Sequence, residues 1–193
     1  RAQLEHYIPQ NLCYRCMQGA VENGVCMRCG GKAQETEKTV PYALPCGTVL
    51  HGRYLIGQVL GAGGFGITYN ALSISDGRHI AIKEFLPVDA AVRAEGSTYV
   101  QSISRDSHVF AIAREQFLKE AQTIYRLRGY PGIVSVEKLF EENNTAYFCM
   151  EYLDGFDLRK HVIASGGRLG VEETLQIMSV VLDALDYIHT RGI

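Results

Sequence analysis

The sequence predicts an α+β fold in which an antiparallel sheet is joined to a small cysteine module. Three observations lead to this prediction: a glycine-rich turn between two strand-like segments, an amphipathic helical segment after the third strand, and two Cys-x2-Cys pairs near the N-terminus. The 193 residues, 47% hydrophobic and 21% charged, suffice for one medium domain and a small module. The formal net charge of −2 gives no electrostatic reason to expect nucleic acid as a partner.

Composition changes divide the chain into five expected segments. No apolar run reaches the roughly 18–20 residues that a membrane helix needs, and the N-terminus lacks the apolar core of a signal peptide. We therefore expect a cytoplasmic chain without a membrane segment. The segments are a leader (1–10), a cysteine module (11–31), a polar and proline-bearing linker (32–52), a sheet domain with a connecting segment (53–153) and a helical segment (154–193).

The cysteine module is the first structural element. Cys13 and Cys16 form one Cys-x2-Cys pair, and Cys26 and Cys29 form the other. Each pair can wrap two thiolates around one side of a metal ion, and the hairpin between them brings the pairs together as a tetrahedral S4 site. About 20 residues cannot build a sufficient core, so the metal would supply the folding energy. The pattern predicts a structural Zn²⁺ ribbon, with disulfides or idle thiols as the alternatives.

The glycine-rich turn follows a strand-like segment at residues 54–60. Residues 67–72 and 79–83, on either side of an Asp-Gly turn, are largely β-branched, aromatic or aliphatic. This pattern is typical of a β-hairpin and not of the helix that opens a dinucleotide-binding fold. Glycines allow backbone N–H groups to approach phosphates closely, and Phe65 at the tip is expected to cover them. A glycine-rich hairpin without a ligand is the alternative.

A helix is expected next, beginning near Asp106 or Ser107 and ending at the Gly-Tyr-Pro-Gly run of residues 129–132. Its sheet-facing positions are Phe117, Ala121 and Ile124, spaced i, i+4 and i+7.

Glu120 sits among these sheet-facing positions. Lys83 ends an apolar strand and requires an acceptor, because a buried ammonium without a partner is costly. We hypothesise a Lys83–Glu120 ion pair that directs the lysine toward the α- and β-phosphates of a nucleotide. The alternative is a solvated Glu120 at the edge of the apolar stripe.

The remaining pattern predicts two strands and two helices. Residues 133–140 and 145–153 read as strands, with a turn at 142–144, and residues 158–163 read as a short helix. A longer amphipathic helix over 171–191 carries an apolar stripe, made of Leu175, Met178, Leu182 and Leu185.

These motifs, taken in order, resemble the N-terminal lobe of a bacterial Ser/Thr protein kinase of the eukaryotic type. The resemblance covers residues 53–193 and rests on the glycine run, the Ile-Ala-Ile-Lys strand, the helix with Glu120 and the Met-Glu-Tyr-Leu segment at 150–153. It implies a five-stranded antiparallel sheet with the αC helix, followed by the first helices of the C-terminal lobe. It also implies that Lys83 and Glu120 are catalytic residues and that ATP is the nucleotide.

The resemblance assigns an adenine pocket residue by residue. Met150 resembles the gatekeeper, while the Glu151 carbonyl and the Leu153 N–H resemble the hinge contacts. Asp157 falls where the family often contacts the ribose. Thr68 replaces the usual valine with a residue of similar shape. An ordinary buried strand is the alternative for the hinge segment. Leu60, Thr68 and Ala81 would sandwich the adenine ring. The full set assigned to ATP is Leu60, Gly61, Ala62, Gly63, Gly64, Phe65, Gly66, Thr68, Ala81, Lys83, Met150, Glu151, Leu153 and Asp157.

The implied parent enzyme transfers the ATP γ-phosphate, with Mg²⁺, to Ser or Thr hydroxyls of protein substrates bound through its C-terminal lobe. No His-Arg-Asp, Asp-Phe-Gly or Ala-Pro-Glu motif occurs in these 193 residues, so the family's general base and Mg²⁺ ligands are absent from them. We therefore expect the chain alone to be inactive, and to self-associate through residues 157–193 because the apolar stripe needs another surface.

A pseudokinase-like or fragment interaction protein with a partner-recruiting ribbon is the alternative function, and a zinc-dependent nucleic-acid binder is a third.

Overall fold

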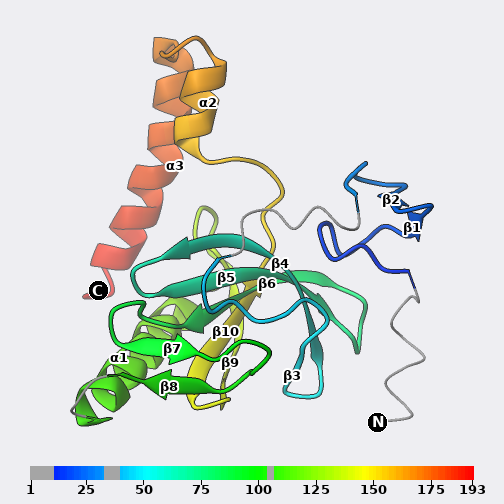
Figure 1. Cartoon of the computed structure of the whole chain (residues 1–193). Coiled ribbons are helices and arrows are strands. Elements are labelled where there is room, and N and C mark those ends of the chain that lie inside the picture. Colours follow the sequence, from blue (N-terminus) through cyan, green and yellow to red (C-terminus); the bar gives the residue numbers. More distant parts are fainter. Residues whose placement is uncertain (1–10, 33–39, 104–106) are drawn as a thin grey trace.

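The structure is a computed structural model, and it describes residues 11–32, 40–103 and 107–193 (Figure 1). A six-stranded antiparallel sheet has the strand order β3-β4-β5-β6-β10-β9, and the two-stranded β1–β2 ribbon lies beside it. The expected leader, the middle of the expected linker (33–39) and the expected helix cap Asp106 lie outside the described residues.

The predicted elements are present, with two additions, which are a sixth strand in the main sheet and a separate two-stranded hairpin within residues 91–102. The α+β class is confirmed, and the sheet has a sixth strand beyond the five expected because Val49–Leu50 pairs with the start of β4. The strands are β1 (Val21–Glu22), β2 (Val25–Cys26), β3 (Val49–Leu50), β4 (Tyr54–Gly63), β5 (Gly66–Ser73), β6 (His79–Phe85), β7 (Ala91–Arg93), β8 (Val100–Ser102), β9 (Val136–Glu142) and β10 (Thr145–Glu151). The helices are α1 (Ser107–Arg126), α2 (Leu158–Ala164) and α3 (Val171–His189).

The register of β5 and β6 determines which side chains share a face of the sheet. Thr68 pairs with Lys83, and Asn70 pairs with Ala81. Because paired residues and alternate residues of a strand project from the same side, all four lie on one face. Phe85 lies on this face too, and its ring centroid is 5.4 Å from that of Phe117 in α1. We call this side of the sheet the α1 face.

The opposite face of the sheet is covered by the β7–β8 hairpin and the segment at residues 40–47. The buried side chains of β6 that point this way are Ile80, Ile82 and Glu84, each no more than 2% exposed. Leu44 donates its backbone N–H to the Tyr69 hydroxyl at 3.0 Å, which fixes the segment against β5. Both faces of the sheet are therefore largely buried along β5, β6 and β10, which explains why these strands read as nearly continuous apolar runs, whereas the second half of β4 is exposed.

A buried ionic network centres on Glu84. Its carboxylate pairs with Arg93 of β7, and the two side chains are 0% and 1% exposed. The hydroxyls of Tyr69 and Tyr147 donate to the same carboxylate at 2.7 and 2.8 Å. Burial, together with the Glu84 charge, raises the pKa of both tyrosine hydroxyls, so they remain protonated donors. Arg93 also donates to the carbonyl oxygens of Thr98 and Tyr42.

The helices α2 and α3 lie side by side and project away from the sheet (Figure 1). The Tyr187 ring of α3 stacks on Tyr130 at 3.7 Å between centroids, near the C-terminal end of the helix. Within α3, which the structure describes throughout, Ala184 is the only buried residue. The predicted apolar stripe is exposed, with Leu175 at 65% and Leu182 at 57%. None of the helices in the described ranges combines the length and hydropathy needed to cross a bilayer.

Replacement of Arg93 by Ala is expected to destabilise the fold by about 3–5 kcal/mol, because it leaves the Glu84 carboxylate buried without its counter-ion. Urea unfolding monitored by circular dichroism measures the loss. The matched control is Arg78→Ala, whose ion pairs with Asp76 and Glu137 are solvent-accessible and contribute about 0–1 kcal/mol. Equal losses in the two variants would show that the Glu84–Arg93 pair does not carry this stability.

Candidate functional site

The four cysteines of the ribbon converge as the sequence predicts. Their Sγ atoms all lie within 4.8 Å of one another, with Cys13 and Cys29 3.8 Å apart and Cys16 and Cys26 3.7 Å apart. Thiolates about 2.3 Å from a tetrahedral ion would be separated by about 3.8 Å, so this donor set fits Zn²⁺. With four protein ligands the coordination is complete, which is typical of a structural site and not of a catalytic one.

The thiols differ in how easily they lose their protons. Hydrogen bonds from the backbone N–H groups of Cys29 and Arg28 lower the pKa of Cys26 to about 6. Burial raises the pKa of Cys13 to about 12. Metal binding requires both as thiolates, so the cation would have to displace the proton of Cys13.

The glycine-rich turn joins β4 to β5 and is open to solvent. A Cβ added at Gly61, Gly63 or Gly64 would meet no atom within 4 Å, so no contact within the described residues demands glycine there. Gly66 differs, since a Cβ at this position would lie 1.9 Å from the Glu84 carbonyl oxygen. Phe65 at the tip is 78% exposed. The space above the first three glycines is consistent with the close approach of a ligand.

Lys83 lies on the α1 face beside the glycine turn, but it does not meet Glu120. Its Nζ atom is 5.9 Å from the centroid of the Phe148 ring. Glu120 is exposed and accepts a 3.4 Å hydrogen bond from Gln116, so the hypothesised ion pair is not formed in this structure. The reason is the rotation of α1 about its axis. Ala121 faces the sheet, and a helix turns about 100° per residue, which carries Glu120 toward solvent.

The residues assigned to adenine lie along the strands next to Lys83. Ala81 pairs directly with Met150 of β10, so the expected gatekeeper adjoins the expected ring contact. Leu60 is 46% exposed and Leu153 is 66% exposed, whereas Ala81 is buried with 4% of its surface exposed. Glu151 and Asp157, which also belong to the set assigned to ATP, form hydrogen bonds with nearby residues of this chain. The Glu151 carboxylate accepts from the Ser135 N–H at 2.6 Å.

Asp157, expected at the ribose, caps the N-terminus of α2. Its carboxylate accepts from the Lys160 N–H at 2.8 Å, and its extended backbone is typical of an N-cap residue.

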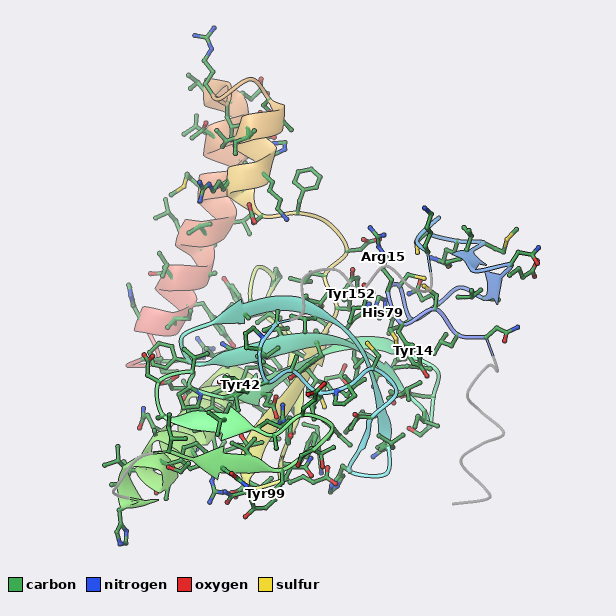
Figure 2. All side chains as sticks on the ribbon, in the orientation of Figure 1. Tyr14, Arg15, Tyr42, His79, Tyr99 and Tyr152 are labelled. Atoms are coloured by element: carbon green, nitrogen blue, oxygen red, sulfur yellow. The ribbon has the colours of Figure 1, made fainter. Side chains whose placement is uncertain are left out.

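Sequence reasoning missed a polar group on the α1 face between the ribbon and the connecting segment after β10. It includes Asn70 of β5, His79 of β6 and Tyr152, whose ring stacks on His79 at 3.8 Å between centroids (Figure 2). Asn70 is 1% exposed, and an asparagine inside a buried strand is the one signal that could have found this group. A cleft of about 400 Å³ lies beside this group, lined by His79, Tyr152 and Asp154 on one side and by ribbon residues such as Arg15 and Arg28 on the other.

Residues 54–193 match the family described as "Protein kinase domain". Among curated relatives, the chain is 32% identical over 147 residues to "Serine/threonine-protein kinase PrkC" of Bacillus subtilis, covering 76% of the chain and 20% of the relative. It is 30% identical over 146 residues to "Serine/threonine-protein kinase B" of Synechocystis, covering 75% and 23%. The chain thus spans about a quarter of the length of the relatives that it matches.

Solved structures agree with the sequence relatives. The kinase domain of Mycobacterium tuberculosis PknI, as a C20A mutant, matches with a TM-score of 0.57 and 28% identity, covering 78% of this chain and 53% of that one. The "PpkA-294 apo form" matches with a TM-score of 0.58 and 31% identity, covering 63% and 43%. The ribbon residues precede the region matched by the family.

The metal site is tested by replacing Cys16 with Ser. We expect the purified variant to lose its Zn²⁺, measured by elemental analysis, because a hydroxyl is a poor substitute for a thiolate on this metal. The control is Cys46→Ser, an exposed cysteine outside the cluster, which should retain one Zn²⁺ per chain. Zinc retention by the Cys16 variant, or none in the unaltered chain, would contradict the four-thiolate site.

Proposed function

This chain belongs to the protein kinase domain family through residues 54–193, and from that premise we propose that it is the ATP-binding part of a Ser/Thr protein kinase carrying a structural Zn²⁺ ribbon. The observation that supports ATP binding best is the placement of the open glycine turn beside Lys83. Thr68, two residues after the turn, pairs directly with Lys83 across β5 and β6. Backbone N–H groups and an ammonium can therefore converge on the same phosphates.

The adenine ring would lie between β4 and the segment after β10. In this proposal Leu60 and Ala81 contact the two faces of the ring, and Met150 closes the back of the pocket. The Glu151 carbonyl and the Leu153 N–H supply the polar contacts that orient the ring. Such pockets combine an apolar lining with a few fixed polar groups, and these residues provide both.

Phosphoryl transfer by the family requires the lysine–glutamate ion pair that is not formed in this structure. We propose that α1 turns about its axis to bring Glu120 toward Lys83 when the site is competent. The position of Glu120 supports this, because it is exposed and its 3.4 Å hydrogen bond is to Gln116 of the same helix, which a turn of α1 would preserve. The turn would have to shift the ring contacts of Phe117 with Phe85 and Phe148.

Further partners follow from the same proposal. Protein substrates would meet the parent enzyme through its C-terminal lobe, and the exposed apolar residues of α3 would mediate self-association of residues 157–193.

Replacement of Lys83 by Met is expected to weaken binding of a fluorescent ATP analogue about tenfold, because a charge-assisted contact to phosphate contributes about 1.5 kcal/mol or more. Fluorescence titration measures the Kd. Lys138→Met, on the exposed side of β9, should leave the Kd unchanged. If both variants bind as the unaltered chain does, Lys83 does not contact the phosphates.

Phosphoryl transfer gives a separate test. We expect the purified 193-residue chain to bind ATP without transferring phosphate to protein Ser or Thr residues, since it lacks the motifs that supply the family's base and Mg²⁺ ligands. Incubation with radiolabelled ATP, Mg²⁺ and a general protein substrate measures transfer. Mg²⁺-dependent labelling of the substrate would refute the expected inactivity.

A further inference from the structure

The ribbon docks on the α1 face of the sheet, the same face that carries Lys83. Leu12 and Met17 of the ribbon form a buried cluster with three sheet-domain residues, and Met17 is only 1% exposed. The sheet-domain members of this cluster are Leu55, Leu72 and Ile74. The contact is therefore a packed interface, and the ribbon is not loosely tethered.

The turn that would wrap the metal is also the part of the ribbon that binds the sheet. Tyr14 and Arg15 are the two residues between Cys13 and Cys16. The Tyr14 carbonyl accepts the backbone N–H of Gln58 in β4 at 2.9 Å. The Arg15 carbonyl accepts the side-chain N–H of Asn70 in β5 at 2.5 Å. Two thiolates and two docking carbonyls thus belong to one four-residue segment.

A second connection runs through His79 (Figure 2). Because the Asn70 amide N–H donates to Arg15, the Asn70 oxygen accepts from Nε2 of His79, and Nδ1 is left to accept from the Gln18 side-chain N–H at 2.9 Å. Both ring nitrogens of a neutral His79 are then used. The same ring stacks on Tyr152, so the ribbon is linked to the segment after β10.

Each docking contact lies next to a residue proposed to contact ATP. Gln58 precedes Leu60 by two positions, and β4 is irregular here, with its register to β5 shifting between Ile56 and Val59. Asn70 pairs directly with Ala81. Tyr152 lies between the two hinge residues. The ribbon therefore contacts β4, β5 and β6 directly, and the segment after β10 through His79, beside the residues proposed to contact adenine.

We propose that the metal-loaded ribbon is a clamp on the nucleotide-binding face, so that ATP affinity depends on metal occupancy of the four-cysteine site. This inference rests on the proposed ATP binding. Without metal, about 20 residues cannot maintain the Cys13–Cys16 turn, and its two carbonyls no longer hold Gln58 and Asn70. The strands that line the pocket then gain freedom that ATP must remove on binding. By linkage, ATP raises the metal affinity of the ribbon by the same factor.

Gly57 offers a selective test of the clamp. A Cβ at this position would lie 2.4 Å from the Tyr14 carbonyl oxygen and 2.5 Å from Sδ of Met17, and its backbone is not in the left-handed region. Gly57→Ala therefore obstructs docking while leaving the four thiols in place. The matched control is Gly170→Ala, where the backbone φ is −67° and an added Cβ meets nothing within 4 Å.

The experiment compares each chain with and without Zn²⁺, using a fluorescent ATP analogue and hydrogen exchange at the Gln58 amide. Removing Zn²⁺ from the unaltered chain should raise the analogue Kd about threefold to tenfold and accelerate Gln58 exchange. Gly57→Ala with Zn²⁺ bound should show the same two changes, and removing its metal should add little, because the two perturbations act through one contact. Gly170→Ala should behave as the unaltered chain.

Two outcomes would overturn the clamp and can be told apart. If the analogue binds with a Kd that neither Zn²⁺ removal nor Gly57→Ala changes, the clamp is wrong while the proposed ATP binding stands. If the unaltered, zinc-loaded chain binds no analogue, the proposed function fails and the clamp fails with it. Should Gly57→Ala not fold, Asn70→Ala removes the donor to the Arg15 carbonyl without a clash and is expected to raise the Kd in the same way.

Discussion

A carboxylate buried inside the sheet domain is the constraint on which the rest of this structure depends. Glu84 has no access to solvent, so its charge must be met by Arg93 and by the hydroxyls of Tyr69 and Tyr147. These partners come from β5, β7 and β10. Through Tyr69 and Arg93 the network also holds the segment at residues 40–47. It fixes the strand that presents Lys83, because the two residues are adjacent on β6.

The sequence predicts well those features that depend on local patterns. The glycine hairpin, the helix spans and the convergence of four cysteines follow from turn chemistry, periodicity and ligand spacing. The Lys83–Glu120 pair is different, because it depends on the rotation of α1, which is set by distant aromatic contacts such as Phe85 with Phe117. The Glu84 network joins residues up to 63 positions apart, and no local pattern identifies such partners.

The family match covers the sheet from β4 onward and the helices that follow, but not β3 or the ribbon, which precede the matched residues. The docking contacts nevertheless use sheet-domain side chains, such as Asn70 and His79, that lie inside the matched region. The ribbon and the sheet domain therefore have complementary contact surfaces. What the ribbon contributes must be derived from these contacts and not from the relatives.

The tight contact at Gly57 has an evolutionary consequence. No side chain fits between β4 and the Tyr14 carbonyl, so selection would remove substitutions of Gly57 for as long as a ribbon docks there. A lineage that lost its ribbon would be released from the restriction, and larger residues could accumulate. In related sequences, a glycine at this position of the strand would then indicate that the N-terminal module packs against the sheet domain. A larger residue would indicate that the module does not pack there.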